Sequence, residues 1–205
     1  MKIEGDYLFE AGVQDVWDAL FDPDVLAAAM PGCEKLELID DELVGEMTIK
    51  VGPISGKFTG KVKLEDKVEP EHYKMIVDGR GAPGFVKATA TIALAPEGDG
   101  TRLRYSADAQ IGGKIASVGQ RLLDASAKAI AKQSLDGLHE NVKIRAAAKN
   151  KPAAPEAPPA AAPEYKRADA GAMAKTVAKA AAKTMLPTIV LLAILVALVV
   201  WLVVR

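Results

Sequence analysis

The chain has 205 residues, which is enough for one domain of ordinary size and additional segments, and its formal net charge at pH 7 is −1. That total combines two parts of opposite sign, because residues 1–148 carry a net charge of −6 and residues 149–205 a net charge of +5. An acidic domain argues against nucleic acid as a partner, and the single cysteine, Cys33, excludes a disulfide within the chain.

In chain order, the first predicted elements are one strand and two short helices. Ile3–Phe9 alternates apolar and polar residues, as a half-buried strand does. Val13–Leu20 and Pro23–Ala29 are then expected to be helical, and the proline that opens the second suits the first turn of a helix.

Six further strands and one long helix complete the predicted domain, residues 1–148. Turns rich in glycine, proline and acidic residues separate the strands, which are expected at Lys35–Ile39, Leu43–Val51, Gly56–Val68, Tyr73–Gly79, Val86–Leu94 and Thr101–Ile111. The stretch from Lys114 to about Ala147 contains no proline and has apolar residues at helical spacing, so it is expected to be a single helix.

This order predicts an α+β fold, a curved seven-stranded antiparallel sheet wrapped around a long C-terminal helix. Small residues on that helix would leave room for a hydrophobic ligand between helix and sheet. The predicted lining residues are Met47, Ile49, Phe58, Val62, Met75, Val77, Phe85, Ala90, Ile92, Tyr105, Ile111, Val118, Leu122, Ala125, Ser126 and Ala129. Methionines suit an adaptable apolar guest, and the Tyr105 hydroxyl suits a carbonyl. The same alternation is also typical of an ordinary packed core, so both interpretations stay open.

The sequence predicts no catalytic or metal site. His72 and His139 are the only histidines, and neither has a cysteine or a carboxylate at ligand spacing. The glycine-rich stretch Gly79–Gly84 lacks the Lys-Ser/Thr pair and the following helix of a phosphate loop. We therefore expect a binding protein rather than an enzyme, with no metal and no cofactor of its own.

Three segments are predicted after the domain. Residues 149–170 are expected to be a flexible linker rich in proline and alanine, and residues 171–184 a basic juxtamembrane helix. Residues 185–204 carry no charge and are long enough, as a transmembrane helix, to cross a hydrocarbon core of about 30 Å. Because basic residues precede this run, the positive-inside rule predicts a single-pass tail anchor in the inner (plasma) membrane, with a cytoplasmic N-terminal domain and membrane lipids as partners.

Three ordered motifs resemble the carbon monoxide dehydrogenase CoxG family of the START-like superfamily. They are MPGCEKLEL at 30–38, VGPISGKFTGKVKLEDKVEP at 51–70 and GDGTRLRYSADAQIGGKIASVGQRLL at 98–123. The sequence departs from the family at Glu10-Ala11-Gly12, where an Ala-Pro pair is usual. The resemblance implies a helix-grip fold with a cavity for hydrophobic molecules, in a protein that accompanies a molybdenum-containing carbon monoxide dehydrogenase or a related hydroxylase without being its catalytic component.

Taken together, these features suggest a membrane-tethered carrier. The expected cargo is a respiratory quinone, menaquinone or ubiquinone, which the carrier extracts from the bilayer and presents to the dehydrogenase so that electrons enter the respiratory chain. Three alternatives stay open: a membrane-recruitment anchor for the dehydrogenase, an assembly or maturation factor for it, and a general lipid-binding protein.

Overall fold

The computed structural model describes residues 1–40, 42–149 and 164–168. Its main feature is one antiparallel sheet with the strand order β1-β7-β6-β5-β4-β3-β2. The strands are β1 (Lys2–Phe9), β2 (Cys33–Ile39), β3 (Glu42–Val51), β4 (Ile54–Val68), β5 (His72–Gly81), β6 (Gly84–Glu97) and β7 (Gly100–Gly112). All seven expected strands are therefore present, and each of β2 to β7 pairs with the strand next to it in sequence, as short hairpins require.

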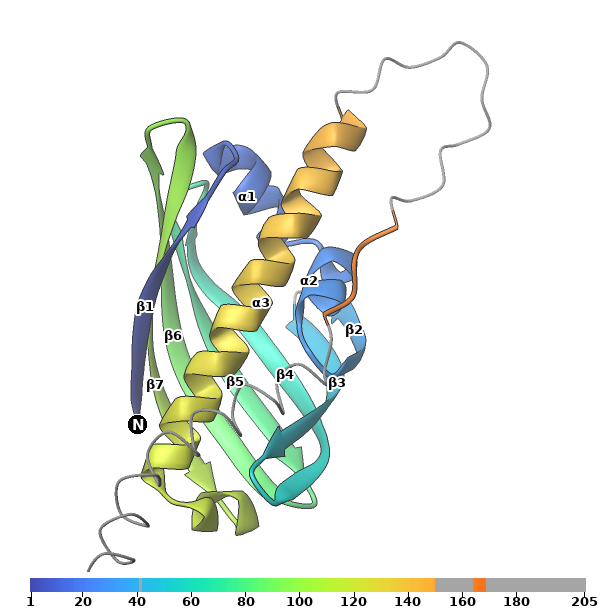
Figure 1. Cartoon of the computed structure of the whole chain (residues 1–205), viewed down its shortest axis with the longest axis vertical. Helices are drawn as coiled ribbons and strands as arrows, with labels where there is room; N and C mark the ends of the chain where they lie inside the picture. Colours follow the sequence, from blue (N-terminus) through green and yellow to red (C-terminus); the bar gives the residue numbers. More distant parts are fainter. Residues whose placement is uncertain (41, 150–163, 169–205) are drawn as a thin grey trace, which may run out of the picture.

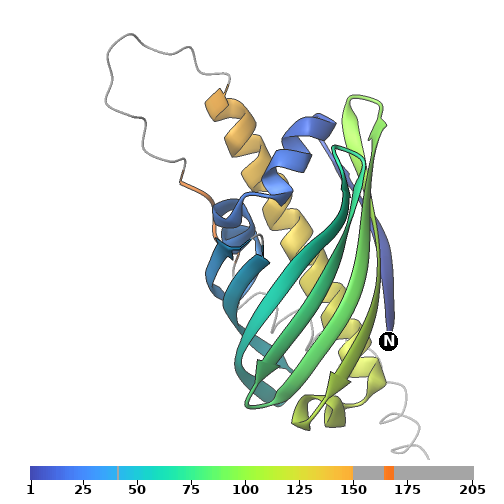
Figure 2. The ribbon, with the colours of Figure 1, turned by 180° about the vertical axis from the view of Figure 1, so that it is seen from behind.

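The helices lie on one side of this sheet. α1 (Val13–Leu20) and α2 (Pro23–Ala29) connect β1 to β2, and α3 (Gln120–Lys149) follows β7. In Figure 1 α3 runs diagonally across the concave face, and Figure 2 shows the sheet from its other side with α3 behind it. Asp22 caps α2 by accepting hydrogen bonds from the backbone N–H groups of Asp24 and Val25, at 3.1 and 3.3 Å.

The long helix begins later than the sequence predicted. Lys114–Val118 forms a short 3-10 helix, η1, and α3 starts only at Gln120. Gly119 separates the two with a φ of 89°, a conformation that an α-helix cannot include and that glycine adopts without steric penalty. The prediction of one helix from Lys114 was therefore wrong at its N-terminal end.

The predicted fold also contained a transmembrane helix, and that part is corrected. Within residues 1–40, 42–149 and 164–168, no helix is both long and apolar enough to cross a membrane. The run 185–204 and the basic stretch 171–184 lie outside the described residues, as does most of the expected linker. The described fold is thus a helix-grip α+β domain.

Two hydrophobic clusters hold α3 to opposite ends of the concave face. One joins α1, α2, the sheet and the C-terminal half of α3, and its buried members include Phe9, Trp17, Tyr73 and Leu138. The other, near η1, is built on the buried side chains Val51, Phe58, Ile115 and Leu123. Among the strands, the backbone of α3 lies nearest to β1 and β3 and farther from the central strands β4 to β7.

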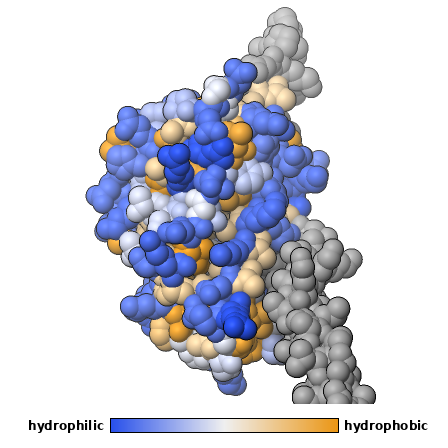
Figure 3. All heavy atoms as spheres, turned by 60° about the vertical axis from the view of Figure 1, so that its left-hand side comes forward, coloured by the Kyte–Doolittle hydropathy of each residue, from blue (hydrophilic) through white to orange (hydrophobic). Residues whose placement is uncertain are grey.

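The outer surface is mostly polar. Figure 3 shows a largely hydrophilic face on which hydrophobic residues form small, separate patches. On the convex side Lys57 pairs with Glu34 at 2.6 Å and with Glu46 at 3.4 Å. The face in view therefore presents little continuous apolar surface.

Candidate ligand-binding site

A row of glycines crosses the middle of the concave face. Gly60 of β4 pairs with Gly79 of β5 and, on its other side, with Gly45 of β3. Their neighbours Phe58, Val62 and Val77 are buried or half-buried while the intervening Lys61 is exposed, which places the row on the face toward α3. Three adjacent strands thus lack a side chain at the same level.

The space above two of these glycines is open. A Cβ added at Gly60 would have only backbone atoms of Asp78 and Gly79 near it, at 3.4 and 3.5 Å, and one added at Gly79 would meet only the Val86 carbonyl oxygen, at 3.8 Å. Gly45 differs, because its Cβ would lie 2.7 Å from the Lys35 carbonyl oxygen of β2. Gly60 and Gly79 therefore form a floor on which an added Cβ would have no side-chain atom within 4 Å.

Apolar side chains surround this floor without being fully buried. Val62 and Val77 pair across β4 and β5 on one side of it, and Val77 pairs with Ala88 of β6. Met47 lies on the other side, opposite Phe58. Of these five residues only Phe58 is buried. Apolar surface left half-exposed beneath a helix is suited to a hydrophobic ligand.

The helix α3 also carries a buried serine. Ser126 is only 2% exposed, and its hydroxyl oxygen has no hydrogen-bond partner. It lies one helical turn after the buried Leu123, on the side of α3 that faces the sheet. A buried hydroxyl without a partner costs about 1–3 kcal/mol, and it can donate a hydrogen bond to a ligand that brings an acceptor.

The predicted lining residues fall into two packed groups with an open middle. Met47, Ile49, Phe58, Ile111, Val118 and Leu122 belong to the cluster near η1, and Met75, Ala90, Ile92 and Tyr105 belong to the cluster around Trp17. Val62, Val77, Ala125 and Ala129 are half-buried and belong to neither. Their role in binding a ligand stays a prediction.

Two predicted residues are oriented differently from the expectation. Phe85 is 41% exposed and packs over Gly112 on the convex face, where its ring would meet a Cβ of that glycine at 2.3 Å. Strand alternation places Val86, not Phe85, toward α3. Tyr105 does lie on the concave face, but its hydroxyl is turned to the β1 edge, 2.6 Å from where a Cβ of Gly5 would stand. Burial, followed by the nearby Asp6, raises the pKa of Tyr105.

Sequence reasoning missed the glycine floor. A glycine within a strand weakens the strand and often marks a position where a ligand or another backbone comes close. That signal was present at Gly60 and Gly79, but their alignment depends on the register of three strands, which single positions do not reveal.

A second polar group joins β1 to α3. The Tyr7 hydroxyl donates a hydrogen bond of 3.0 Å to Asp136, and His139 stacks on Phe9 with a centroid distance of 5.6 Å. His139 Nε2 lies 3.6 Å from a carboxylate oxygen of Glu10. Across the described residues, no three histidine, cysteine or acidic side chains are grouped so that they could hold a metal. This group ties the edge strand to the helix.

A curved sheet that holds a long helix over a partly open apolar face defines a helix-grip protein of the START-like superfamily. The chain belongs to the carbon monoxide dehydrogenase CoxG family, whose model matches residues 5–143. No curated protein sequence matches the chain.

Solved structures agree with this assignment. A conserved protein from Geobacillus kaustophilus is 33% identical, with a TM-score of 0.67 over 70% of this chain and 95% of that one. A START superfamily protein from Mycobacterium smegmatis is 13% identical, with a TM-score of 0.54 over 69% and 97% of the two chains. An aromatase/cyclase from Streptomyces sp. R1128 is 14% identical, with a TM-score of 0.56 over 73% and 98%.

The last two likenesses show the fold alone, and that fold serves an enzyme in one case, so it does not decide function. The family description links this chain to carbon monoxide dehydrogenase.

Proposed function

We propose that this protein is a quinone carrier for a molybdenum-containing carbon monoxide dehydrogenase. The observation that supports the proposal best is the open floor of Gly60 and Gly79 beneath α3. A quinone ring is flat, and a floor without side chains lets such a ring approach the sheet backbone. The ring then lies between the floor and the small residues of the helix.

The surrounding side chains suit the rest of a quinone. The half-buried Met47 and Ile49 of β3, on one side of the floor, line an isoprenoid tail with adaptable apolar surface. The Ser126 hydroxyl donates a hydrogen bond to a ring carbonyl, which provides the partner that this buried group lacks. No ionised group is needed, because the oxidised quinone is neutral.

The chemistry requires a carrier rather than a second catalyst. Oxidation of CO with water yields CO₂, two protons and two electrons, and a quinone takes up two electrons and two protons to become the quinol. The dehydrogenase performs the first half-reaction. This protein shields the water-insoluble tail while the ring accepts electrons, so it needs no redox cofactor of its own.

We also propose that the carrier works at the cytoplasmic face of the inner membrane, where it exchanges quinone with membrane lipids. The exposed Lys166 and Arg167 and the net positive charge of residues 149–205 support contact with anionic headgroups. Fractionation of cells that express the full chain tests this location, and recovery in the soluble fraction alone would contradict it.

The decisive experiment compares two tryptophan variants of neighbouring residues on β6. Ala88→Trp fills the concave face beside the floor, whereas Thr89→Trp adds the same ring on the convex face. Native mass spectrometry with lipid extraction, on the full chain from a host that makes quinones, is expected to find quinone on the wild type and on Thr89→Trp. Occupancy of Ala88→Trp should fall to less than about a tenth.

Equal occupancy in both variants would place the ligand elsewhere. A wild-type protein that carries no quinone but still binds the dehydrogenase would favour the recruitment function, and a stoichiometric phospholipid in its place would favour general lipid binding.

A further inference from the structure

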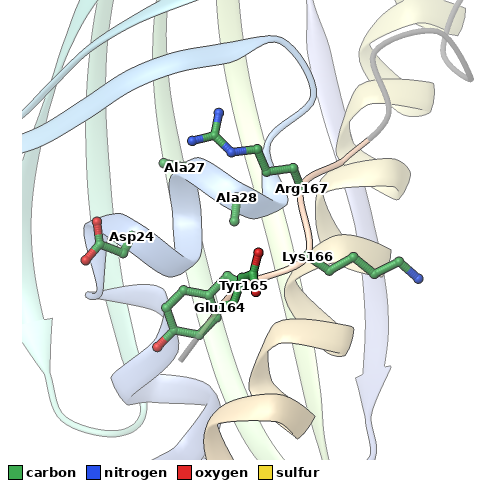
Figure 4. Close-up of a pocket in the computed structure, with 7 residues that line it drawn as sticks. All are labelled: Asp24, Ala27, Ala28, Glu164, Tyr165, Lys166 and Arg167. Carbon is green, nitrogen blue, oxygen red and sulfur yellow. The ribbon is translucent and has the colours of Figure 1, made fainter. Parts of the chain in front are cut away.

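Residues 164–168 lie against the domain, although the sequence places them in a linker. This strap, as we call residues 164–168, has no regular secondary structure and runs beside α2 (Figure 1), where hydrogen bonds join it to α2 and to α3. Its neighbours on α2 are Asp24, Ala27 and Ala28, with which Glu164–Arg167 line a pocket of about 710 Å³. Figure 4 shows the Arg167 side chain extending over α2 and that of Lys166 pointing away from it.

Asn141 of α3 holds the strap by its backbone. The Asn141 side chain is fully buried, and its Oδ1 accepts a hydrogen bond from the Lys166 N–H at 2.9 Å. Its Nδ2 donates to the Lys166 carbonyl oxygen at 3.3 Å. The amide therefore binds both backbone groups of one residue, as a neighbouring strand would. Without the strap these polar atoms would lie beside the buried Leu138 and Val142 with neither of these partners.

Two further contacts fix the strap on either side of Lys166. The Tyr165 ring packs against the hydrophobic cluster that contains Leu138 and Val142. The Ala168 N–H donates a hydrogen bond of 2.8 Å to the carbonyl oxygen of Ala28. That oxygen belongs to the last turn of α2, whose carbonyl groups have no partner within the helix.

We propose that the groove between α2 and α3 is a peptide-docking site built around Asn141, and that its occupant, the strap of the same chain, latches α2 onto α3. The site selects an extended segment with an aromatic residue followed by a residue that offers both backbone groups. The Lys166 side chain is exposed and plays no part in this recognition.

The latch matters because α2 is short. A helix of seven residues is not stable alone, so contacts with α3, β2 and the strap hold it in place. Arg145 of α3 pairs with Asp22 at the N-terminal end of α2, and the strap bonds its C-terminal end.

The test uses two substitutions of the same exposed residue in the full chain. Lys166→Pro removes the N–H that Asn141 binds, whereas Lys166→Ala keeps both backbone groups. Hydrogen–deuterium exchange should be about five- to tenfold faster at the Ala168 amide and in α2 for Lys166→Pro, and unchanged for Lys166→Ala. Unchanged exchange in Lys166→Pro would overturn the latch, and equal acceleration in both variants would overturn backbone recognition by Asn141.

Asn141→Leu provides an independent test from the other side of the contact. The leucine keeps the volume of the buried site, so the domain should stay folded while the strap is released. The Ala168 amide is then expected to exchange as fast as in Lys166→Pro, with core amides of the sheet as protected as in the wild type. Protection of Ala168 equal to that of the wild type would contradict the proposal. None of these readouts depends on a bound quinone.

Discussion

Gly137 of α3 lies directly against the backbone of Ala29 in α2, so that a Cβ on Gly137 would stand 2.9 Å from the Ala29 carbonyl oxygen and 3.1 Å from its Cα. The two helices can come this close only because no side chain separates them. This contact, with the strap and the Asp22–Arg145 pair, positions α2 on the domain.

Gly137→Ala should therefore destabilise the fold although alanine is the better helix former. The gain in helix propensity is about 1 kcal/mol, whereas displacing a packed backbone costs about 1–3 kcal/mol. We expect a net loss in the free energy of unfolding, measured by urea denaturation. Lys128→Ala, at an exposed position of the same helix, should change it by less than about 0.5 kcal/mol. A Gly137→Ala protein as stable as the wild type would show that α2 shifts freely.

Filling the glycine floor should separate stability from ligand binding. Gly79→Val adds a β-branched side chain at a position where the Cβ would have no atom nearer than 3.8 Å, so we expect the stability of the ligand-free protein to stay equal or to rise by up to about 1 kcal/mol. Quinone occupancy should fall, as measured by lipid extraction.

Gly81 provides the matched contrast on the same strand. A Cβ there would lie 2.2 Å from the Lys57 carbonyl oxygen, so Gly81→Ala should destabilise the protein. Wild-type occupancy in Gly79→Val would show that the floor does not contact the ligand.

Ser126→Ala removes the buried hydroxyl that has no partner. Because an unsatisfied group is lost with little change in volume, we expect the ligand-free protein to be as stable as the wild type or slightly more stable. Loss of one hydrogen bond to the quinone ring should weaken binding about two- to tenfold. Titration of both proteins with a short-chain quinone measures the difference. Equal quinone affinities of the wild type and Ser126→Ala would show that Ser126 does not bind the ligand.

Tyr7 should make stability depend on pH at the alkaline end. Burial, then the hydrogen bond to Asp136, raises the pKa of Tyr7 to about 12, above the ordinary value of 10. The unfolded chain therefore loses this proton first, so the contribution to stability is complete below pH 10 and is lost as the pH rises to about 12.

Tyr7→Phe tests that dependence directly. We expect a loss of about 1 kcal/mol at pH 7 and a shallower decline above pH 10 than in the wild type. The decline should not vanish, because burial also raises the pKa of Tyr73. Denaturation curves recorded between pH 7 and pH 11 give both quantities, and parallel declines would contradict the assignment to Tyr7.

Local patterns predicted most elements correctly because they report properties of a few neighbouring residues. The bounds of α1 and α2 are those expected at Val13–Leu20 and Pro23–Ala29, and all seven strands overlap their predicted ranges. The predicted start of α3 was wrong because Gly119 adopts a positive φ, which composition alone does not indicate. The expected transmembrane helix is not among the helices of the described residues.

Periodicity, turn residues and motifs are written along the chain, so they were enough to predict the seven strands, their antiparallel pairing, the helices α1 and α2 and the family to which the chain belongs. Folding in three dimensions was needed to reveal that Gly60 and Gly79 form a floor, that Phe85 faces outward, and that Asn141 binds Lys166 from 25 residues away. These relations depend on strand register and on contacts between distant segments. Their energies come from burial and from satisfied polar groups, which exist only once the chain is folded.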